Sequence, residues 1–229
     1  MIGHAVSRAV EQLWDPAFRR VLAWSLLWTV LLFVALAAGV SQLIDYAPQA
    51  ESRLVNIFAD VAAWMLFAIA AWFLFPAFAT AIMGLFLDDA AQAVEHKYYP
   101  GDPPGVALGL GTAFWEALKL GLVILGVNIL ALPLYVLALF VPFVGPLLVY
   151  YLINGYLLGR EYFELVGMRH LRPRQVKALR QRRRGSLILY GIPIAFVFSI
   201  PIVNLIAPLF GTAYMVHIFK ALSRNSRPL

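Results

Sequence analysis

Four long stretches of this chain contain no Asp, Glu, Lys or Arg, and they constrain its fold more than any other feature. They are Val21–Val40, Val61–Leu87, Leu120–Gly159 and Leu187–Phe219. About 20 consecutive apolar residues suffice for a helix to cross a bilayer, whereas a membrane β-strand shows short alternating segments. Charged residues make up 13% of the chain, against about 25% in a typical soluble domain. The sequence therefore predicts an all-α integral membrane protein.

The residue types that carry catalysis and metal binding are sparse. The chain has no cysteine, which excludes disulfides, thiolate catalysis and cysteine-ligated zinc or iron–sulfur centres. Its four histidines are scattered without metal-ligand spacing, and no nucleophile elbow, metalloprotease motif or phosphate-binding loop is present. We therefore expect no enzymatic activity, no catalytic residue, no metal and no cofactor.

Basic residues predict the orientation in the membrane. Three arginines precede the first apolar run, eight bases lie between residues 168 and 186, and three more follow the last run. The loop at 41–60 has only Arg53. By the positive-inside rule, both termini and the basic segment are cytoplasmic and the loop is outside. We interpret the basic segment as an orientation signal that contacts anionic lipids, with no nucleic-acid partner.

The last two apolar runs begin and end on the same predicted side of the membrane. After allowance for a turn, the legs of the last run have about 15 residues, or about 22 Å, which is less than the roughly 30 Å hydrocarbon core. Both runs are therefore predicted to form helical hairpins that penetrate only partly. The expected layout is an amphipathic helix at 1–15, spans at 17–45 and 55–98 (the second kinked), a hairpin at 106–168, a basic segment at 169–185 and a hairpin at 186–220.

Two local features leave alternatives open. The amphipathic helix at 1–15 can lie in the membrane interface or pack on the protein's own cytoplasmic face. The hairpin tips Val141–Pro146 and Ile200–Asn204 share an apolar-Pro-apolar-apolar-Gly/Asn pattern, which indicates an internal repeat or simply marks two turns. Gly155 and Gly159 form a GxxxG pattern that permits close helix approach, within one subunit or between subunits.

A few polar residues are candidates for function. Arg19 and Arg20 stand at the mouth of the first span, where paired guanidinium groups suit an oxyanion. The alternative is that both side chains snorkel to lipid phosphates. Arg160, Glu161 and Glu164 end the first hairpin, and they form either a local ion-pair set or a gating or proton-relay group.

Four segments in the same order resemble the CysZ-type bacterial sulfate permeases of the etoposide-induced membrane protein superfamily. They are Asp15–Arg20, Phe75–Asp88, Phe140–Glu164 and Ala178–Asn204. The resemblance implies two long transmembrane helices, two partly penetrating hairpins and a homo-oligomer. It also implies sulfate uptake through the bacterial inner membrane for cysteine synthesis, with sulfate and membrane lipids as partners. The alternative is a membrane scaffold of the same fold that transports nothing.

The resemblance also implies which residues bind sulfate. In the family, sulfate sits near an arginine pair that matches Arg19 and Arg20. The family's Gly-Leu-Leu-Ala-Glu stretch matches Gly84, Leu85, Phe86, Leu87 and Asp88, with Leu in place of Ala and Asp in place of Glu. The family's Gln-Tyr-x-Asp reads Glu-Tyr-x-Glu here, from Glu161 to Glu164.

Overall fold

A computed structural model describes residues 1–48, 51–107 and 109–224, and this part of the chain forms nine α-helices and no strand. The helices are α1 (Ile2–Gln12), α2 (Pro16–Tyr46), α3 (Arg53–Gly84), α4 (Leu87–Tyr98), α5 (Leu110–Ala138), α6 (Val144–Met168), α7 (Pro173–Arg182), α8 (Arg184–Ser199) and α9 (Ala207–Arg224). A 3₁₀ turn at Val203–Leu205 precedes α9. The segment expected as one kinked span at 55–98 thus comprises two helices, α3 and α4.

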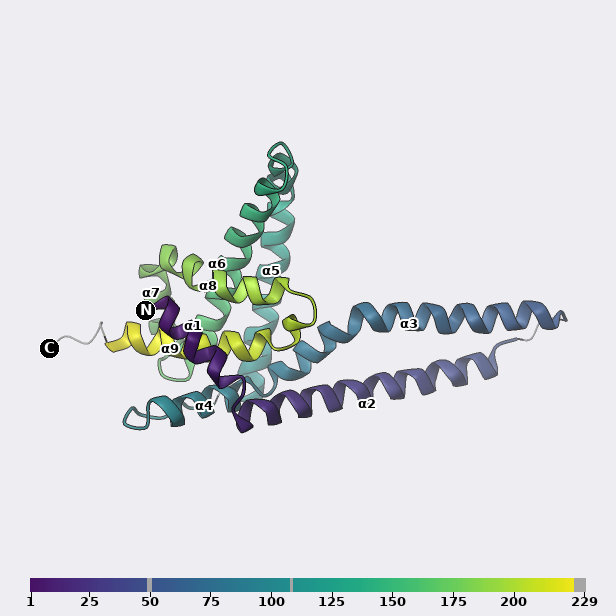
Figure 1. Ribbon diagram of the computed structural model, residues 1–229, viewed down its shortest axis with the longest axis horizontal. Helices are drawn as coiled ribbons and strands as arrows, with labels where there is room; N and C mark the ends of the chain where they lie inside the picture. Colours follow the sequence, from purple (N-terminus) through teal and green to yellow (C-terminus); the bar gives the residue numbers. More distant parts are fainter. Residues whose placement is uncertain (49–50, 108, 225–229) are drawn as a thin grey trace.

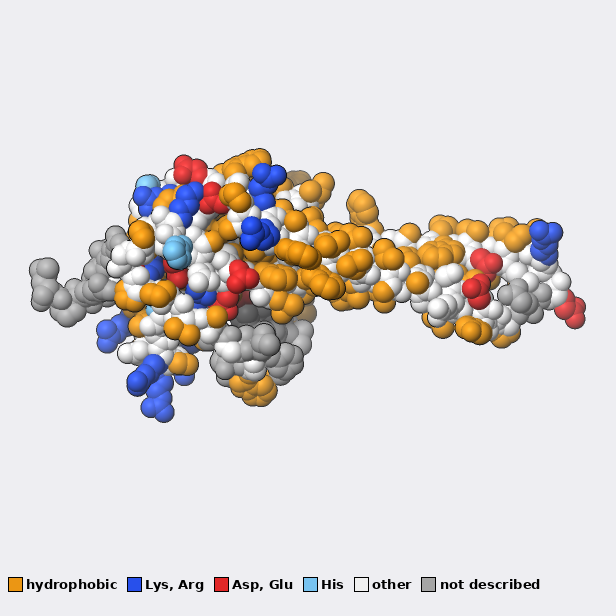
Figure 2. Space-filling model, turned by 90° about the horizontal axis from the view of Figure 1, so that it is seen from below, with side chains coloured by type: hydrophobic (Ala, Val, Ile, Leu, Met, Phe, Trp, Pro, Cys, Tyr) orange, Lys and Arg blue, Asp and Glu red, His pale blue; other side chains and the backbone are white. Residues whose placement is uncertain are grey.

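The helices α2 and α3 pack side by side in opposite directions and project from the rest of the protein as a long arm (Figure 1). Both are long and apolar enough to cross a membrane, and α2 alone measures about 46 Å at 1.5 Å per residue. Large apolar side chains cover the arm, with charged groups at its far end (Figure 2). Trp72 and Phe73, for example, are 80% and 74% exposed. Since water is a poor solvent for such a surface, the protein is a membrane protein.

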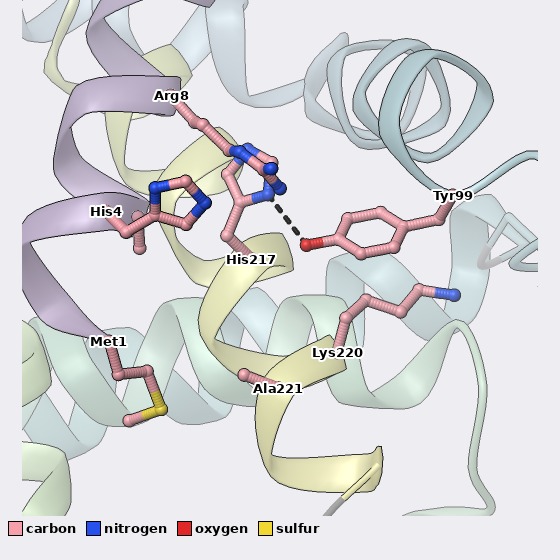
Figure 3. Close-up of a pocket in the computed structure, with 8 residues that line it drawn as sticks. Met1, His4, Arg8, Tyr99, His217, Lys220 and Ala221 are labelled. Carbon is pink, nitrogen blue, oxygen red and sulfur yellow. Dashed lines mark hydrogen bonds between the residues drawn. The ribbon is translucent and has the colours of Figure 1, made fainter.

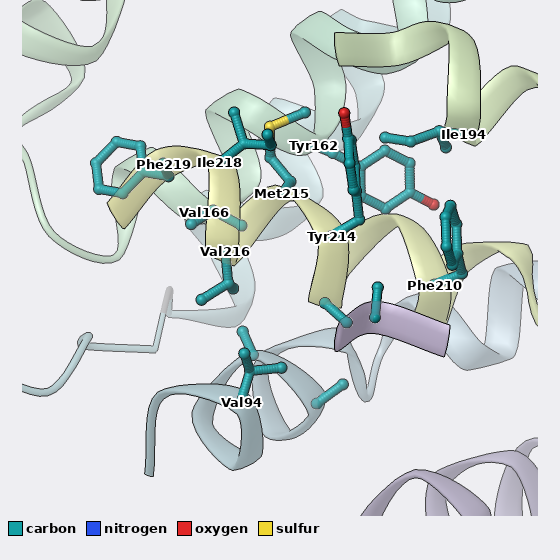
Figure 4. Close-up of a cluster of buried hydrophobic side chains, with 14 of the residues drawn as sticks. Val94, Tyr162, Val166, Ile194, Phe210, Tyr214, Met215, Val216, Ile218 and Phe219 are labelled. Carbon is teal, nitrogen blue, oxygen red and sulfur yellow. The ribbon is translucent and has the colours of Figure 1, made fainter. Parts of the chain in front are cut away.

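The core of the body is built around α9. Nearly every residue of α9 up to Leu222 is buried, as expected for a helix that is apolar on most of its surface. Helices α1, α4, α6 and α8 all pack on it. Figure 4 shows Val216 pointing toward Val94 of α4, while Tyr214 points toward Ile194 of α8.

Helix α1 packs on α9 through its small residues. Ala5 and Ala9 are 3% and 0% exposed, and Gln12 is also fully buried. Other apolar residues remain outside this contact: Val10 of α1 is 46% exposed, and Trp14, just beyond the helix, is 78% exposed. The helix therefore contacts the protein's own body with one face and keeps apolar groups at the surface, and its position at the membrane interface stays a prediction.

Glycines bring α6 and α8 into backbone contact. A Cβ atom built on Gly159 would overlap the carbonyl oxygen of Leu187 in α8. A Cβ atom built on Gly191 of α8 would overlap the carbonyl oxygen of Gly155 in α6. The GxxxG pattern is thus used within one chain, where small residues allow two helices to approach closely.

The two hairpin turns adopt the same unusual backbone conformation. Phe143 and Ile202 each follow a proline and have φ values of 64° and 68°. In each turn the next amide donates a 2.8 Å hydrogen bond to the proline carbonyl, from Val144 to Pro142 and from Val203 to Pro201. This geometry is a classic γ-turn, which is rare and strained. Its occurrence at both tips supports the interpretation of an internal repeat.

The two hairpins point in different directions. The α8–α9 hairpin runs in the same direction as the arm, and its turn lies against α3 (Figure 1). The α5–α6 hairpin points toward the top of this view, across the direction of the arm. Its tip carries large exposed apolar residues, among them Phe140 and Phe143, at 82% and 87% exposure. Partial penetration of the bilayer by the two hairpins stays a prediction.

Candidate anion-binding site

The start of α2 is tied to the body by an ion pair. Asp15 is the N-cap residue and Pro16 occupies the first helical position, where its missing N–H costs nothing. Lys97, near the end of α4, donates to both carboxylate oxygens of Asp15, at 2.8 and 2.9 Å. The first turn of α2 is therefore held beside α4.

The register of α2 turns Arg19 and Arg20 outward. Phe18, Val21 and Ser25 form the buried face of the helix, in the spacing expected for one helical stripe. Arg19 and Arg20 lie between these positions, so both side chains are exposed. Neither makes an ion pair with a residue that the structure describes. Two adjacent guanidinium groups thus stand at the surface at the base of the arm.

The second predicted segment forms the turn between α3 and α4. Gly84 is the last residue of α3, and Leu85 and Phe86 turn the chain into α4 with hydrogen bonds from their amides to Ile82 and Met83. Gly84 and Leu85 are exposed, and the space next to the Gly84 Cα is open. Leu87 points inward and is 6% exposed. The turn therefore presents its first two residues at the surface and anchors itself through Leu87.

The fold brings the two predicted segments together. Phe18 and Val21 of α2 belong to the same buried cluster as Met83 and Leu87, and α2 packs on both α3 and α4. The arginine pair and the α3–α4 turn therefore share one hydrophobic base. The α2 end also contributes the positive end of a helix dipole, which favours an anion at this place.

Asp88, the last predicted residue, faces a different partner. Its carboxylate forms a close ion pair with the guanidinium of Arg169, which also donates to the Asp88 backbone carbonyl at 3.2 Å. Arg169 follows α6 and is 4% exposed. The Asp88–Arg169 pair holds the α3–α4 turn to the end of α6. Because Asp88 is an acid, it is not itself a ligand for an anion.

A buried ion-pair cluster extends from Asp88 along α4. Glu95 accepts hydrogen bonds from Arg169 at 3.3 Å and from the amide of Gly105 at 3.1 Å, and its other oxygen lies 2.7 Å from His170 Nε2. Burial raises the pKa of Glu95, but the hydrogen bonds from His170 and Arg169 outweigh it and bring the pKa down to about 2. The cluster ties α4, the loop after it and the end of α6 into one unit.

Sequence reasoning missed this cluster. In the sequence Arg169 is only one of eight bases in the basic segment, and no motif marks Glu95. The partners lie 74 and 81 residues apart, and no local pattern pairs an acid in one polar segment with a base in another. A buried arginine can be recognised only once the position of Arg169 beside α4 is known.

The third predicted group lies on the last turns of α6. Arg160 Nε lies 3.4 Å from Glu164 Oε1, four residues along the helix, and Arg180 of α7 lies 2.7 Å from the same oxygen. Glu161 is partly buried and has no ion-pair partner in the described part of the chain. Arg160 and Glu164 thus form a local ion pair shared with α7, and a gating role stays a prediction.

A family model described as Sulfate transporter CysZ/Etoposide-induced protein 2.4 matches residues 5–208. The chain belongs to this family. The match confirms the resemblance seen in the sequence, and it includes Arg19, Arg20, the α3–α4 turn and the Arg160–Glu164 pair. No curated protein sequence matches the chain well enough to be counted as a relative. The family is a transporter-type membrane family.

Proposed function

We propose that this protein carries sulfate, or a closely related inorganic oxyanion, across the bacterial inner membrane, where the sulfate feeds cysteine synthesis. The observation that carries the proposal is the position of Arg19 and Arg20, exposed at the base of a membrane-length arm in a member of the CysZ family. Arginine binds tetrahedral oxyanions through paired, charge-assisted hydrogen bonds. In this proposal the pair binds the anion at the base of the arm.

The surroundings of the pair favour an anion. The nearest acidic group on α2, Asp15, is neutralised by Lys97 at 2.8 Å. Asp88 on the neighbouring turn is neutralised by Arg169. With these two carboxylates paired, Asp89 is the remaining acid of the first turn of α4. The two arginines outnumber it, and the N-terminal end of the α2 dipole adds to their positive potential. The Asp88–Arg169 contact then has a positioning role, because it fixes the turn beside the arginines.

The arrangement in the membrane follows from the two hairpins and the exposed apolar surfaces. The hairpins α5–α6 and α8–α9 enter the bilayer only partly, and copies of the chain associate so that each covers the exposed apolar surfaces of another. Both termini and the basic segment face the cytoplasm, and anionic lipids contact the bases. In this arrangement the arginine pair lies on the cytoplasmic side.

A non-transporting membrane scaffold is the second candidate. The observation that favours it is the ion pair between Asp88 and Arg169, because this pair gives part of the predicted binding segment a structural role. A scaffold needs the helix packing and the exposed apolar surfaces, but it needs no anion site.

Sulfate flux into liposomes separates the two functions. The full chain is purified and reconstituted into liposomes, and radiolabelled sulfate is added outside. Liposomes without protein are the blank. We expect flux above the blank in the wild type and a loss of most of it in the double variant Arg19→Gln, Arg20→Gln. The matched control is Arg174→Gln, Arg182→Gln, which removes two exposed charges from α7. Wild-type flux equal to the blank would favour the scaffold.

A further inference from the structure

A pocket lined by basic side chains opens where α1, the end of α4 and α9 meet (Figure 3). Its volume is about 370 Å³, within the range of small-ligand sites of about 300–1,000 Å³. Arg8 and His4 come from α1, Tyr99 follows α4, and His217 and Lys220 come from α9. No carboxylate is among the described residues that line it. The proposed transport function uses none of these residues.

His217 carries a polar atom that the protein leaves unpaired. Its ring is 4% exposed, and Nδ1 lies 2.9 Å from the Tyr99 hydroxyl. Its Nε2 atom is buried and has no hydrogen-bond partner within the described chain. When the Tyr99 hydroxyl donates to Nδ1, Nε2 carries the proton and is a donor that awaits an acceptor. Leaving such a group unpaired in a buried place is unfavourable, so a ligand that accepts its hydrogen bond is favoured.

The potential in the pocket is positive. The Arg8 guanidinium lies 5.1 Å from the centre of the Tyr98 ring and makes no ion pair with a described residue. Lys220 lies 3.4 Å from Asp102 and so has part of its charge compensated. Burial, followed by the neighbouring Arg8 and His4, lowers the pKa of His217 to about 4. Of these causes, the Arg8 guanidinium is the one that gives the pocket a positive potential.

We propose that this pocket is a second oxyanion site that binds a phosphate or sulfate group, with Arg8 and His217 as its ligands. Arg8 grips two oxygens of the group through its guanidinium, and His217 donates from Nε2 to a third. The group is either a free inorganic ion or the phosphate of an anionic lipid. The second source is within reach because Val10 of α1 and Trp14, just beyond its end, are exposed apolar residues. Binding would fasten α1 to α9, and it does not depend on transport.

The test uses the full chain with Arg19→Gln and Arg20→Gln, so that binding at the start of α2 does not contribute. In one arm the detergent-solubilised protein is titrated with inorganic phosphate and then sulfate, against chloride at the same ionic strength. In the other arm the titrant is dihexanoyl phosphatidic acid, against dihexanoyl phosphatidylcholine. Thermal unfolding is the readout, because a ligand that binds only the folded state raises the melting temperature. A melting temperature that rises to a plateau with phosphate or sulfate identifies a free ion as the ligand. A plateau with phosphatidic acid alone identifies a lipid.

Three further substitutions in this background decide whether the pocket is responsible. Arg8→Gln removes the guanidinium, and His217→Asn keeps a partner for Tyr99 while removing Nε2. Each is expected to weaken binding about tenfold or more, the scale for one hydrogen bond to a charged group. Arg174→Gln, on exposed α7, is the matched control and should leave binding unchanged. No saturable shift in either arm, or equal binding after Arg8→Gln, would overturn the proposal. If the starting variant does not fold, the same substitutions are compared in the wild type by the number of sites in equilibrium dialysis.

Discussion

Gly191 of α8 lies directly against Gly155 of α6, so closely that their backbones touch. A Cβ atom on Gly191 would overlap the Gly155 carbonyl oxygen, and a Cβ atom on Gly155 would lie 3.0 Å from the carbonyl oxygen of Ile188. Backbone atoms cannot swing away as a side chain can, so any added carbon must push the helices apart. Because α6 and α8 both pack on α9, a shift there reaches the core of the body.

The first prediction concerns this contact. Gly191→Ala is expected to lower the free energy of unfolding by about 1–3 kcal/mol, the range for overpacking a well-filled contact. Gly185→Ala is the matched control, since Gly185 lies in the same helix with nothing within 4 Å of its built Cβ. The control should be neutral or slightly stabilising, because alanine is the better helix former. Unfolding in detergent measures both, and equal stability of Gly191→Ala and wild type would contradict the contact.

The second prediction follows from the lowered pKa of Glu95. Its pKa is about 2 in the folded protein, against the ordinary glutamate pKa of 4.5 in the unfolded chain. A carboxyl group with a depressed folded pKa stabilises the protein above pH 4.5 and loses that contribution as the pH falls toward 2. Melting temperatures between pH 6 and 3 should therefore fall for the wild type and for the exposed control Asp89→Asn. The Glu95→Gln protein should start lower and lose less, and parallel curves for Glu95→Gln and wild type would refute the assignment.

The third prediction concerns Arg169, the centre of the same cluster. Removing one partner of a buried ion pair costs about 3–5 kcal/mol, because the other charge stays buried without compensation. Arg169→Gln should show this loss in unfolding experiments, since it removes the guanidinium that is paired with both Glu95 and Asp88. Arg174→Gln, from the same basic segment but exposed, should change the stability by less than about 0.5 kcal/mol. A similar small effect of both substitutions would mean that Arg169 is solvated.

The fourth prediction separates the two interpretations of the arginine pair. If Arg19 and Arg20 bind sulfate, replacing one by Ala weakens binding by about 1.5–3 kcal/mol, or roughly ten- to a hundredfold. Lys should restore only part of the affinity, because it lacks the planar fork of the guanidinium. If the side chains only snorkel to lipid, Lys replaces Arg fully and the sulfate affinity stays constant. Calorimetric titration of the wild type, Arg19→Lys and Arg20→Lys distinguishes these results.

The fifth prediction concerns orientation. Ser52 lies at the far end of the arm and Ser186 in the first turn of α8, next to the basic segment (Figure 1). Because the chain has no cysteine, a single Cys at either place gives a clean label. An impermeant thiol reagent outside intact cells should label Cys at position 52 and leave Cys at position 186 unlabelled, by the positive-inside rule. Labelling at 186 from outside would reverse the proposed orientation.

Local patterns predicted the helices and their turns well where a physical rule acts within a few residues. The charge-free runs at 21–40 and 61–87 lie within α2 and α3 up to the turn at Leu85, since apolar length alone decides whether a helix can span a bilayer. Pro142 and Pro201 stand in the turns of both hairpins. The pattern did not reveal that Phe143 and Ile202 take a left-handed backbone, because neither residue type favours it.

Interactions between distant segments were beyond prediction from a single sequence. The GxxxG pattern at Gly155 was compatible with contacts inside or between subunits, and only the position of Gly191 shows that it is used inside the chain. The amphipathic pattern of α1 was compatible with lipid or protein on its inner face, and the burial of Ala9 shows that α9 covers part of it.

The sequence by itself determined that this is a helical membrane protein, because long apolar runs can form all their backbone hydrogen bonds in lipid only as helices. It also marked Arg19 and Arg20 through their place beside such a run. The tertiary structure alone decided which charges meet. Arg169 and Arg174 are nearly neighbours in the chain, yet one is buried against Asp88 and Glu95 and the other is exposed. The reason is that the energy of a charge depends on the groups packed around it, and packing brings together residues that the sequence keeps far apart.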